Sequence, residues 1–111
     1  MSGQDLMVEL SGKIGLLDSA LKQFGKRGRD NAGAEEKYRI ALAQKILIER
    51  DKGTPATVIS DICRGDKNIA RLKFERDCAE VTYKAAQEAI NIYKLQIRVL
   101  QDTIEREFRS G

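Results

Sequence analysis

Histidine and tryptophan are absent from this chain of 111 residues, and proline occurs only once. Without histidine, the chain lacks the side chain that most often transfers protons at neutral pH, and no Cys-His or Ser-His pair can form. A glycine-rich phosphate-binding loop is also missing from the sequence. We therefore expect no catalytic residues, and the sequence argues against an enzyme.

Cysteine is scarce as well: Cys63 and Cys78 are the two in the chain. Two cysteines without a histidine cannot form a standard structural zinc site alone, and the Glu-x-x-His pairs of iron–carboxylate bundles are absent. We expect no metal and no cofactor. Both thiols are interpreted as small core side chains in a reducing, cytoplasmic setting.

Long apolar runs are missing, so no segment is long enough to cross a bilayer. The start of the sequence shows no basic leader followed by an apolar stretch. We therefore predict a cytoplasmic protein with no membrane partner. Its content of 41% hydrophobic and 33% charged residues is typical of a soluble helical protein, and its length predicts a single domain, 1–111.

The stretch from Asp66 to Arg109 has neither proline nor glycine, and apolar residues recur through it in alternating steps of four and three. This spacing predicts one very long C-terminal helix with an apolar seam along one side. The C-terminal seam comprises Ala79, Tyr83, Ala86, Ile90, Tyr93, Ile97, Leu100 and Ile104.

A helix of about 43 residues would be roughly 64 Å long. A compact globule formed by a chain of this length has a diameter of only roughly 35 Å. We therefore expect a second copy of the chain to cover the seam, in a homo-oligomer that is most simply a dimer. The expected interface residues are Tyr83, Ala86, Ile90, Tyr93, Ile97, Leu100 and Ile104.

A second apolar stripe lies mainly off this seam. It consists of Phe74, Cys78, Val81, Ala85, Ala89, Ile92 and Val99. Two apolar faces on one helix are typical of a helix that is covered on two sides. The pattern leaves open which stripe belongs to the core of one chain and which to an interface.

The N-terminal part, 1–33, is predicted to be an amphipathic helix followed by a flexible basic loop. Apolar residues from Leu10 to Phe24 follow helical spacing, but three glycines then fall between Gly25 and Gly33. The remaining part, 34–111, is predicted to be a helical hairpin. Its first helix should end at Gly53.

A tight elbow is expected between the two arms of this hairpin. Thr54 is expected to cap a short helix that begins at Pro55, because proline suits the first helical position. Gly65 is expected to end that helix in the left-handed conformation, and Asp66 to cap the long helix. The predicted fold is thus an all-α helical bundle with a helix–elbow–helix hairpin.

Two clusters of cations are candidate binding sites. Lys22, Lys26, Arg27 and Arg29 form a basic stretch, which could contact nucleic-acid phosphates or an acidic protein surface. At the elbow, Arg64, Lys67 and Arg71 lie near two predicted helix N-termini, which could hold an anion or an acidic partner. A purely structural elbow is the alternative to the second site.

Three segments in the last two-thirds of the chain are similar to segments of a known class of proteins. PATVISDICRGD at 55–66, IARLKFERD at 69–77 and YKAAQEAIN at 83–91 resemble small helical accessory proteins of bacteriophages and prophages of Gram-positive bacteria. The resemblance implies a non-catalytic protein that binds and inhibits or modulates a host protein or protein–nucleic-acid complex, such as a CRISPR or other defence nuclease. A DNA- or RNA-binding recombination accessory factor and a structural phage assembly component are the alternatives. The resemblance assigns no site residues.

Overall fold

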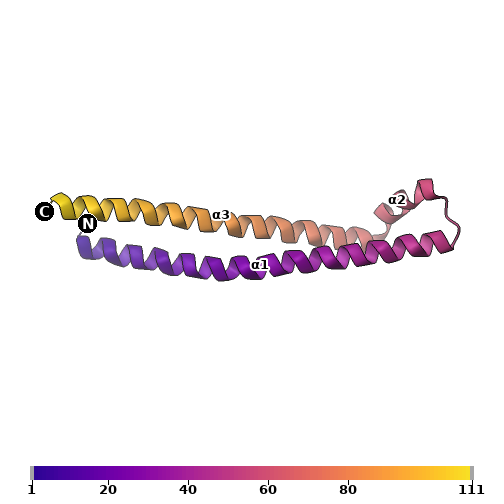
Figure 1. The fold of residues 1–111 in the computed structure, drawn as a ribbon, viewed down its shortest axis with the longest axis horizontal. Helices are drawn as coiled ribbons and strands as arrows, with labels where there is room; N and C mark the ends of the chain where they lie inside the picture. The colour runs from indigo at the N-terminus through magenta and orange to yellow at the C-terminus, as the bar shows by residue number, and fades with distance from the viewer. Residues whose placement is uncertain (1, 111) are drawn as a thin grey trace. The chain divides into compact units, whose positions relative to one another are not determined.

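The computed structural model describes residues 2–110, which form three α-helices (Figure 1). These are α1 (Gly3–Asp51), α2 (Ala56–Gly65) and α3 (Lys67–Ser110). They divide into two compact units. The first unit contains α1 up to Lys26 and α3 from Lys84 onward; the second runs from Arg27 to Tyr83 and contains α2. The all-α class and the long C-terminal helix are confirmed.

The prediction of a flexible loop between Gly25 and Gly33 is wrong, because α1 continues through these glycines without a break. Each glycine weakens a helix by about 1 kcal/mol relative to alanine, but packing against a neighbouring helix can outweigh that cost. Gly28 shows how. A Cβ atom on this residue would lie 3.2 Å from Cε1 of Tyr83, so the absent side chain makes room for the aromatic ring.

In the first unit, α1 and α3 lie side by side (Figure 1). Leu6 of α1 and Ile90 of α3 are its most buried hydrophobic residues, with 5% and 6% of their surfaces exposed. Leu10, Leu17 and Phe24 on α1 are half-buried. The spacing of these α1 residues continues the four-three pattern of a helix that packs along one seam.

The C-terminal seam faces inward along its whole length: Ile90 is buried and its other members are half-buried. The premise of the interface prediction, that no part of the same chain could cover this seam, is therefore wrong. In the first unit α1 supplies the cover. A homo-oligomer stays a prediction.

In the second unit, the end of α1 and the start of α3 are antiparallel neighbours. Gly28 lies against Tyr83, Glu35 Oε2 is 3.5 Å from Arg76 Nε, and Lys45 Nζ is 3.6 Å from Asp66 Oδ2. Contacts therefore move backward along α1 as they move forward along α3. This confirms the predicted hairpin arms. The buried hydrophobic residues of this unit are Ile59 and Cys63 on α2 and Ile69 on α3.

Gly53 forms the turn that terminates α1, as predicted. Its φ of 81° lies in the left-handed region that glycine adopts readily. The backbone N–H of Gly53 donates to the carbonyl of Arg50, and that of Thr54 donates to the carbonyl of Glu49, both at 3.0 Å. This pair of bonds is a Schellman motif, which satisfies two carbonyl groups at the helix end.

Two details of the predicted elbow are wrong. Thr54 does not cap α2: Pro55 occupies the N-cap position, and the Thr54 hydroxyl donates to Glu49 Oε2 at 2.8 Å instead. Gly65 is not left-handed, because α2 stays helical through it and the chain turns at Asp66, with φ −69° and ψ 129°. The predicted Asp66 cap is confirmed, since its Oδ1 accepts a bond from the Ile69 N–H at 3.0 Å.

Candidate partner-binding groove

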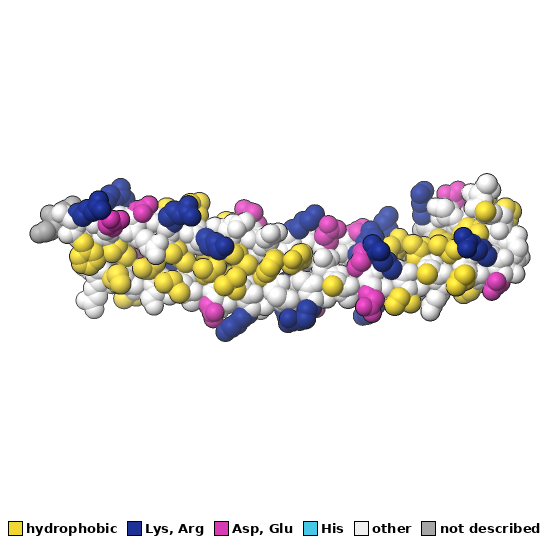
Figure 2. All heavy atoms as spheres, in the orientation of Figure 1, with side chains coloured by type: hydrophobic (Ala, Val, Ile, Leu, Met, Phe, Trp, Pro, Cys, Tyr) yellow, Lys and Arg dark blue, Asp and Glu magenta, His cyan; other side chains and the backbone are white. Residues whose placement is uncertain are grey.

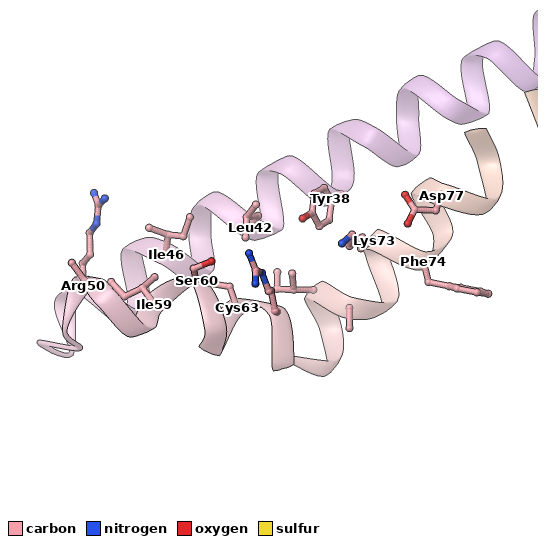
Figure 3. A pocket seen from close by; sticks show the side chains of 14 residues that line it. Tyr38, Leu42, Ile46, Arg50, Ile59, Ser60, Cys63, Lys73, Phe74 and Asp77 are labelled. Atoms are coloured by element: carbon pink, nitrogen blue, oxygen red, sulfur yellow. The ribbon is translucent and has the colours of Figure 1, made fainter. Parts of the chain in front are cut away.

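The second unit has an open groove of about 860 Å³ between its three helical segments (Figure 3). We call this feature the groove. Its lining residues are Tyr38, Leu42, Ile46 and Arg50 of α1, Ala56, Ile59, Ser60, Cys63 and Arg64 of α2, and Ile69, Ala70, Lys73, Phe74 and Asp77 of α3.

Helical spacing places these side chains together. The α1 residues recur every four positions, so they share one side of that helix. On α2, Ile59 and Cys63 point toward α1 (Figure 3). The strong amphipathic pattern of this short helix turns its apolar side inward, where these two residues become buried. The floor of the groove is therefore apolar and comes from all three helices.

The edge of the groove is basic. Arg50, Arg64 and Lys73 are exposed cations among the lining residues, and Asp77 is the carboxylate there. Asp77 Oδ1 already accepts bonds from Nε and Nη2 of Arg76, at 3.1 and 3.0 Å. Arg64 Nη1 is 3.9 Å from Asp61 Oδ1, but both side chains are mostly exposed. Water therefore screens this pair strongly.

Arg76 fixes one wall of the groove. Its guanidinium carbon lies 4.5 Å from the centre of the Tyr38 ring, a cation–π contact. Hydrogen bonding to the Asp77 carboxylate raises the pKa of Arg76 above its ordinary value, and Glu35 and Tyr38 add to the effect. The side chain is a permanent cation, and it holds Tyr38 and Asp77 in defined positions.

A polar cluster ties the two arms together at the elbow. The Glu49 side chain has 7% of its surface exposed, and its Oε1 lies 3.0 Å from Lys45 Nζ. Bonds from Lys45 and Thr54 lower the pKa of Glu49 from its ordinary 4.5. Bonding to Glu49 raises the pKa of Lys45. The backbone N–H of Ile69 lowers the pKa of Asp66, with a contribution from Lys45. All three groups are thus charged at neutral pH.

The basic stretch, of which the sequence predicts Lys26, Arg27 and Arg29 in a loop, lies wholly on α1 and outside the groove. Lys22 belongs to the first unit and pairs with Asp18 at 3.2 Å; Arg27 belongs to the second unit and pairs with Asp30 at 3.8 Å. Lys26 and Arg29 are exposed. Helical spacing now sets the directions of these cations, and acidic neighbours offset part of their charge.

Of the three elbow cations, only Arg64 lines the groove. Arg71 pairs with Glu75 at 3.1 Å and lies 5.6 Å from the centre of the Phe74 ring. Lys67 is exposed in the first turn of α3. Sequence reasoning missed Arg50 and Lys73 as groove residues. The available signal was the four-residue spacing that places Arg50 on the same side as Leu42 and Ile46.

The second apolar stripe is largely exposed. Phe74 has 58% of its surface exposed and Val81 has 68%, and Cys78 is exposed rather than in the core. The prediction that both thiols are core residues therefore holds only for Cys63. Figure 2 shows hydrophobic side chains gathered on one face of the helices, between scattered charges.

Two other kinds of site, metal-binding clusters and membrane-spanning helices, are lacking between residues 2 and 110. No group of three or more His, Cys, Asp or Glu residues is placed there to hold a metal ion. None of the helices in the same range has an apolar stretch long enough to span a bilayer.

Comparison with protein-family models, with curated proteins and with solved structures finds no match to the chain.

Proposed function

We propose that this protein is a non-catalytic binding protein and that its partner docks in the groove. The observation that carries the proposal is the combination of an apolar floor from three helices with a basic edge. Its volume of about 860 Å³ lies within the range of about 300–1,000 Å³ that ligand-binding sites occupy.

The physical driving force for docking is the burial of apolar surface. Among the lining residues, Phe74 has 58% of its surface exposed, and Leu42 and Ile46 are half-buried. Each Å² of apolar surface removed from water contributes about 25 cal/mol, before the costs of association are subtracted. A partner that covers these side chains gains this energy without any chemical step.

A narrower form of the proposal is a phage accessory protein that inhibits or modulates a host protein or protein–nucleic-acid complex. The resemblance described above supports this form, and the groove would then hold a segment of the host protein. Direct binding of nucleic acid is the rival. The pairing of Lys22 and Arg27 with acidic neighbours argues against it, because paired cations release fewer counterions on binding.

Site-specific photo-crosslinking tests the proposal. A photoreactive phenylalanine analogue would replace Phe74 in one variant and Val81 in a matched control. Both positions are exposed on α3 of the second unit, but only Phe74 lines the groove. Each variant would be irradiated in a lysate of the source cells, with and without nuclease treatment. Mass spectrometry would then identify the crosslinked peptide.

We expect one partner peptide to crosslink at position 74, to be weak or absent at position 81, and to persist after nuclease treatment. Competition with an excess of unlabelled wild-type protein should abolish the crosslink, whereas the variant Phe74→Asp should compete poorly. Equal crosslinking at both positions, or crosslinks to nucleic acid alone, would contradict a protein partner in the groove.

A further inference from the structure

The charges on the edge of the groove indicate which charges a partner surface should carry. Within residues 2–110, neither Arg50 nor Lys73 has a carboxylate at ion-pair distance, and the Asp61 partner of Arg64 is 3.9 Å away. The edge carboxylate of Asp77 is engaged by Arg76. The groove therefore presents an uncompensated positive edge around an apolar floor. A complementary surface must be apolar at its centre and acidic at its border.

The backbone that surrounds the groove indicates which secondary structure a bound partner segment should have. All of its lining residues belong to α-helices, so the groove contains no β-strand. An extended peptide would find no strand edge to pair with, and its own backbone groups would lose water without compensation. A helix satisfies its backbone internally, so it can enter an apolar groove at no such cost.

We propose that the groove binds one amphipathic α-helix that carries Asp or Glu on both sides of its apolar stripe. Apolar residues at positions i, i+3 or i+4, and i+7 would contact Leu42, Ile46 and Phe74. The flanking carboxylates would lie near Arg50, Arg64 and Lys73. This inference rests on the proposed function, because it names the chemistry of the partner at the same site.

A displayed peptide library tests the inference without knowledge of the natural partner. Each peptide would be a helix of about four turns, with fixed leucines along one stripe. The flanking positions would vary among acidic, basic and amide side chains. Selection would use three full-length proteins: the wild type, the edge variant Arg50→Glu/Arg64→Glu/Lys73→Glu, and the control variant Arg29→Glu/Lys37→Glu/Lys67→Glu.

The control variant reverses three exposed cations of the same unit that lie outside the groove, so both variants carry the same net charge. Circular dichroism would check that all three proteins fold. We expect the wild type and the control to enrich acidic flanks, and the edge variant to enrich basic flanks. The best acidic peptide should bind the edge variant at least about tenfold more weakly than the wild type, since three partly exposed pairs are reversed.

Three results would overturn the inference. One is enrichment of basic or amide flanks by the wild type, and another is an equal preference in the edge and control variants. The third is a second copy of the chain in the groove, which would appear as a concentration-dependent mass in sedimentation that Phe74→Asp abolishes. If position 74 crosslinks to a partner in lysate but selection shows no acidic preference, the proposed function stands and this inference fails. If neither experiment gives a specific partner, both fail.

Discussion

At the scale of single residues, the contact with Tyr83 explains why a glycine stands at position 28, inside a helix and not in a loop. The missing Cβ allows the ring to approach α1, because Cε1 lies 3.2 Å from the place a Cβ would take. Gly33, one turn and a half further along α1, has no atom within 4 Å of its Cβ position. A side chain added at Gly28 would therefore contact Tyr83, whereas a Cβ added at Gly33 would meet open space.

Substitutions at these glycines should change stability in opposite directions. Gly28→Leu should destabilise the protein by about 1–3 kcal/mol, because the added side chain overpacks the contact with Tyr83. Gly33→Ala should stabilise it by about 0.5–1 kcal/mol, because alanine favours the helix and meets open space. Urea denaturation of both variants and the wild type measures the difference. Stabilisation by Gly28→Leu would show that the ring does not pack there.

The Glu49 cluster predicts how stability depends on pH. The folded pKa values of Glu49 and Asp66 lie below their ordinary values of 4.5 and 3.8. Their contribution is therefore complete at neutral pH and is lost as the pH falls below about 4.5 and through the folded values. The pKa of Lys45 is raised above 10.5, so its contribution is present below that pH and is lost as the pH rises through the folded value.

Thermal denaturation of the wild type and Glu49→Gln from about pH 7 to about pH 3 tests this dependence. The glutamine has the size of the glutamate but no charge for Lys45. We expect the variant to melt at a lower temperature at neutral pH, and the difference to shrink under acid conditions. A difference that stays constant across this range would mean that the ionised Glu49 does not stabilise the elbow.

At the scale of elements, the C-terminal end of α2 is built differently from the C-terminal end of α1. The turn after α1 requires a left-handed residue and has Gly53, with φ 81°. The turn after α2 instead uses an extended Asp66, and Gly65 remains helical. The difference gives the two glycines separate roles, although each directly follows a cationic residue in the sequence.

Alanine substitutions should separate these roles. Gly53→Ala should cost about 1–2 kcal/mol, because an L-residue is strained in the left-handed conformation. Gly65→Ala should be neutral or stabilising by up to about 1 kcal/mol, because its Cβ would meet no atom within 4 Å and the residue is helical. Melting curves by circular dichroism compare the two. Equal destabilisation by both would contradict the helical backbone of Gly65.

Sequence periodicity predicted the elements better than their boundaries. The steps of four and three gave α3 and its seam, and Gly53, Pro55 and Asp66 marked the elbow. The continuity of α1 was not predictable, because a run of glycines lowers local helix propensity while the compensating contact with Tyr83 comes from a residue distant in sequence. The groove was missed for the same reason: Arg50, Arg64 and Lys73 come from three helices whose packing no local pattern specifies.

At the scale of the whole molecule, the C-terminal seam is covered by the chain that carries it. Ile90 has 6% of its surface exposed in the first unit, whereas Val99 on the same helix has 55% exposed. The apolar surface of α3 that remains for contacts with other molecules therefore lies off the seam, in the exposed members of the second stripe together with Leu95 and Phe108.

Shortening the side chains of Ile90 and Val99 to alanine should affect stability to different extents. Ile90→Ala should destabilise the protein by about 2–5 kcal/mol, because it leaves a cavity in a buried contact, whereas Val99→Ala should cost less than about 0.5 kcal/mol. The loss at Ile90 should not depend on protein concentration if its neighbours belong to the same chain. Denaturation at several concentrations provides the measurement. A marked concentration dependence would assign the seam to a second copy instead.

The elbow also has a consequence for the order in which the chain folds. Its bonds join residues close in sequence, such as Thr54 to Glu49 and Ile69 to Asp66, so they close with little loss of chain entropy. Contacts such as Gly28 with Tyr83 enclose far longer loops until the elbow has formed. We therefore expect the elbow to be the folding nucleus. In stopped-flow experiments Asp66→Ala should mainly slow refolding, and Ile90→Ala should mainly speed unfolding; the reverse assignment would place the nucleus near the chain ends.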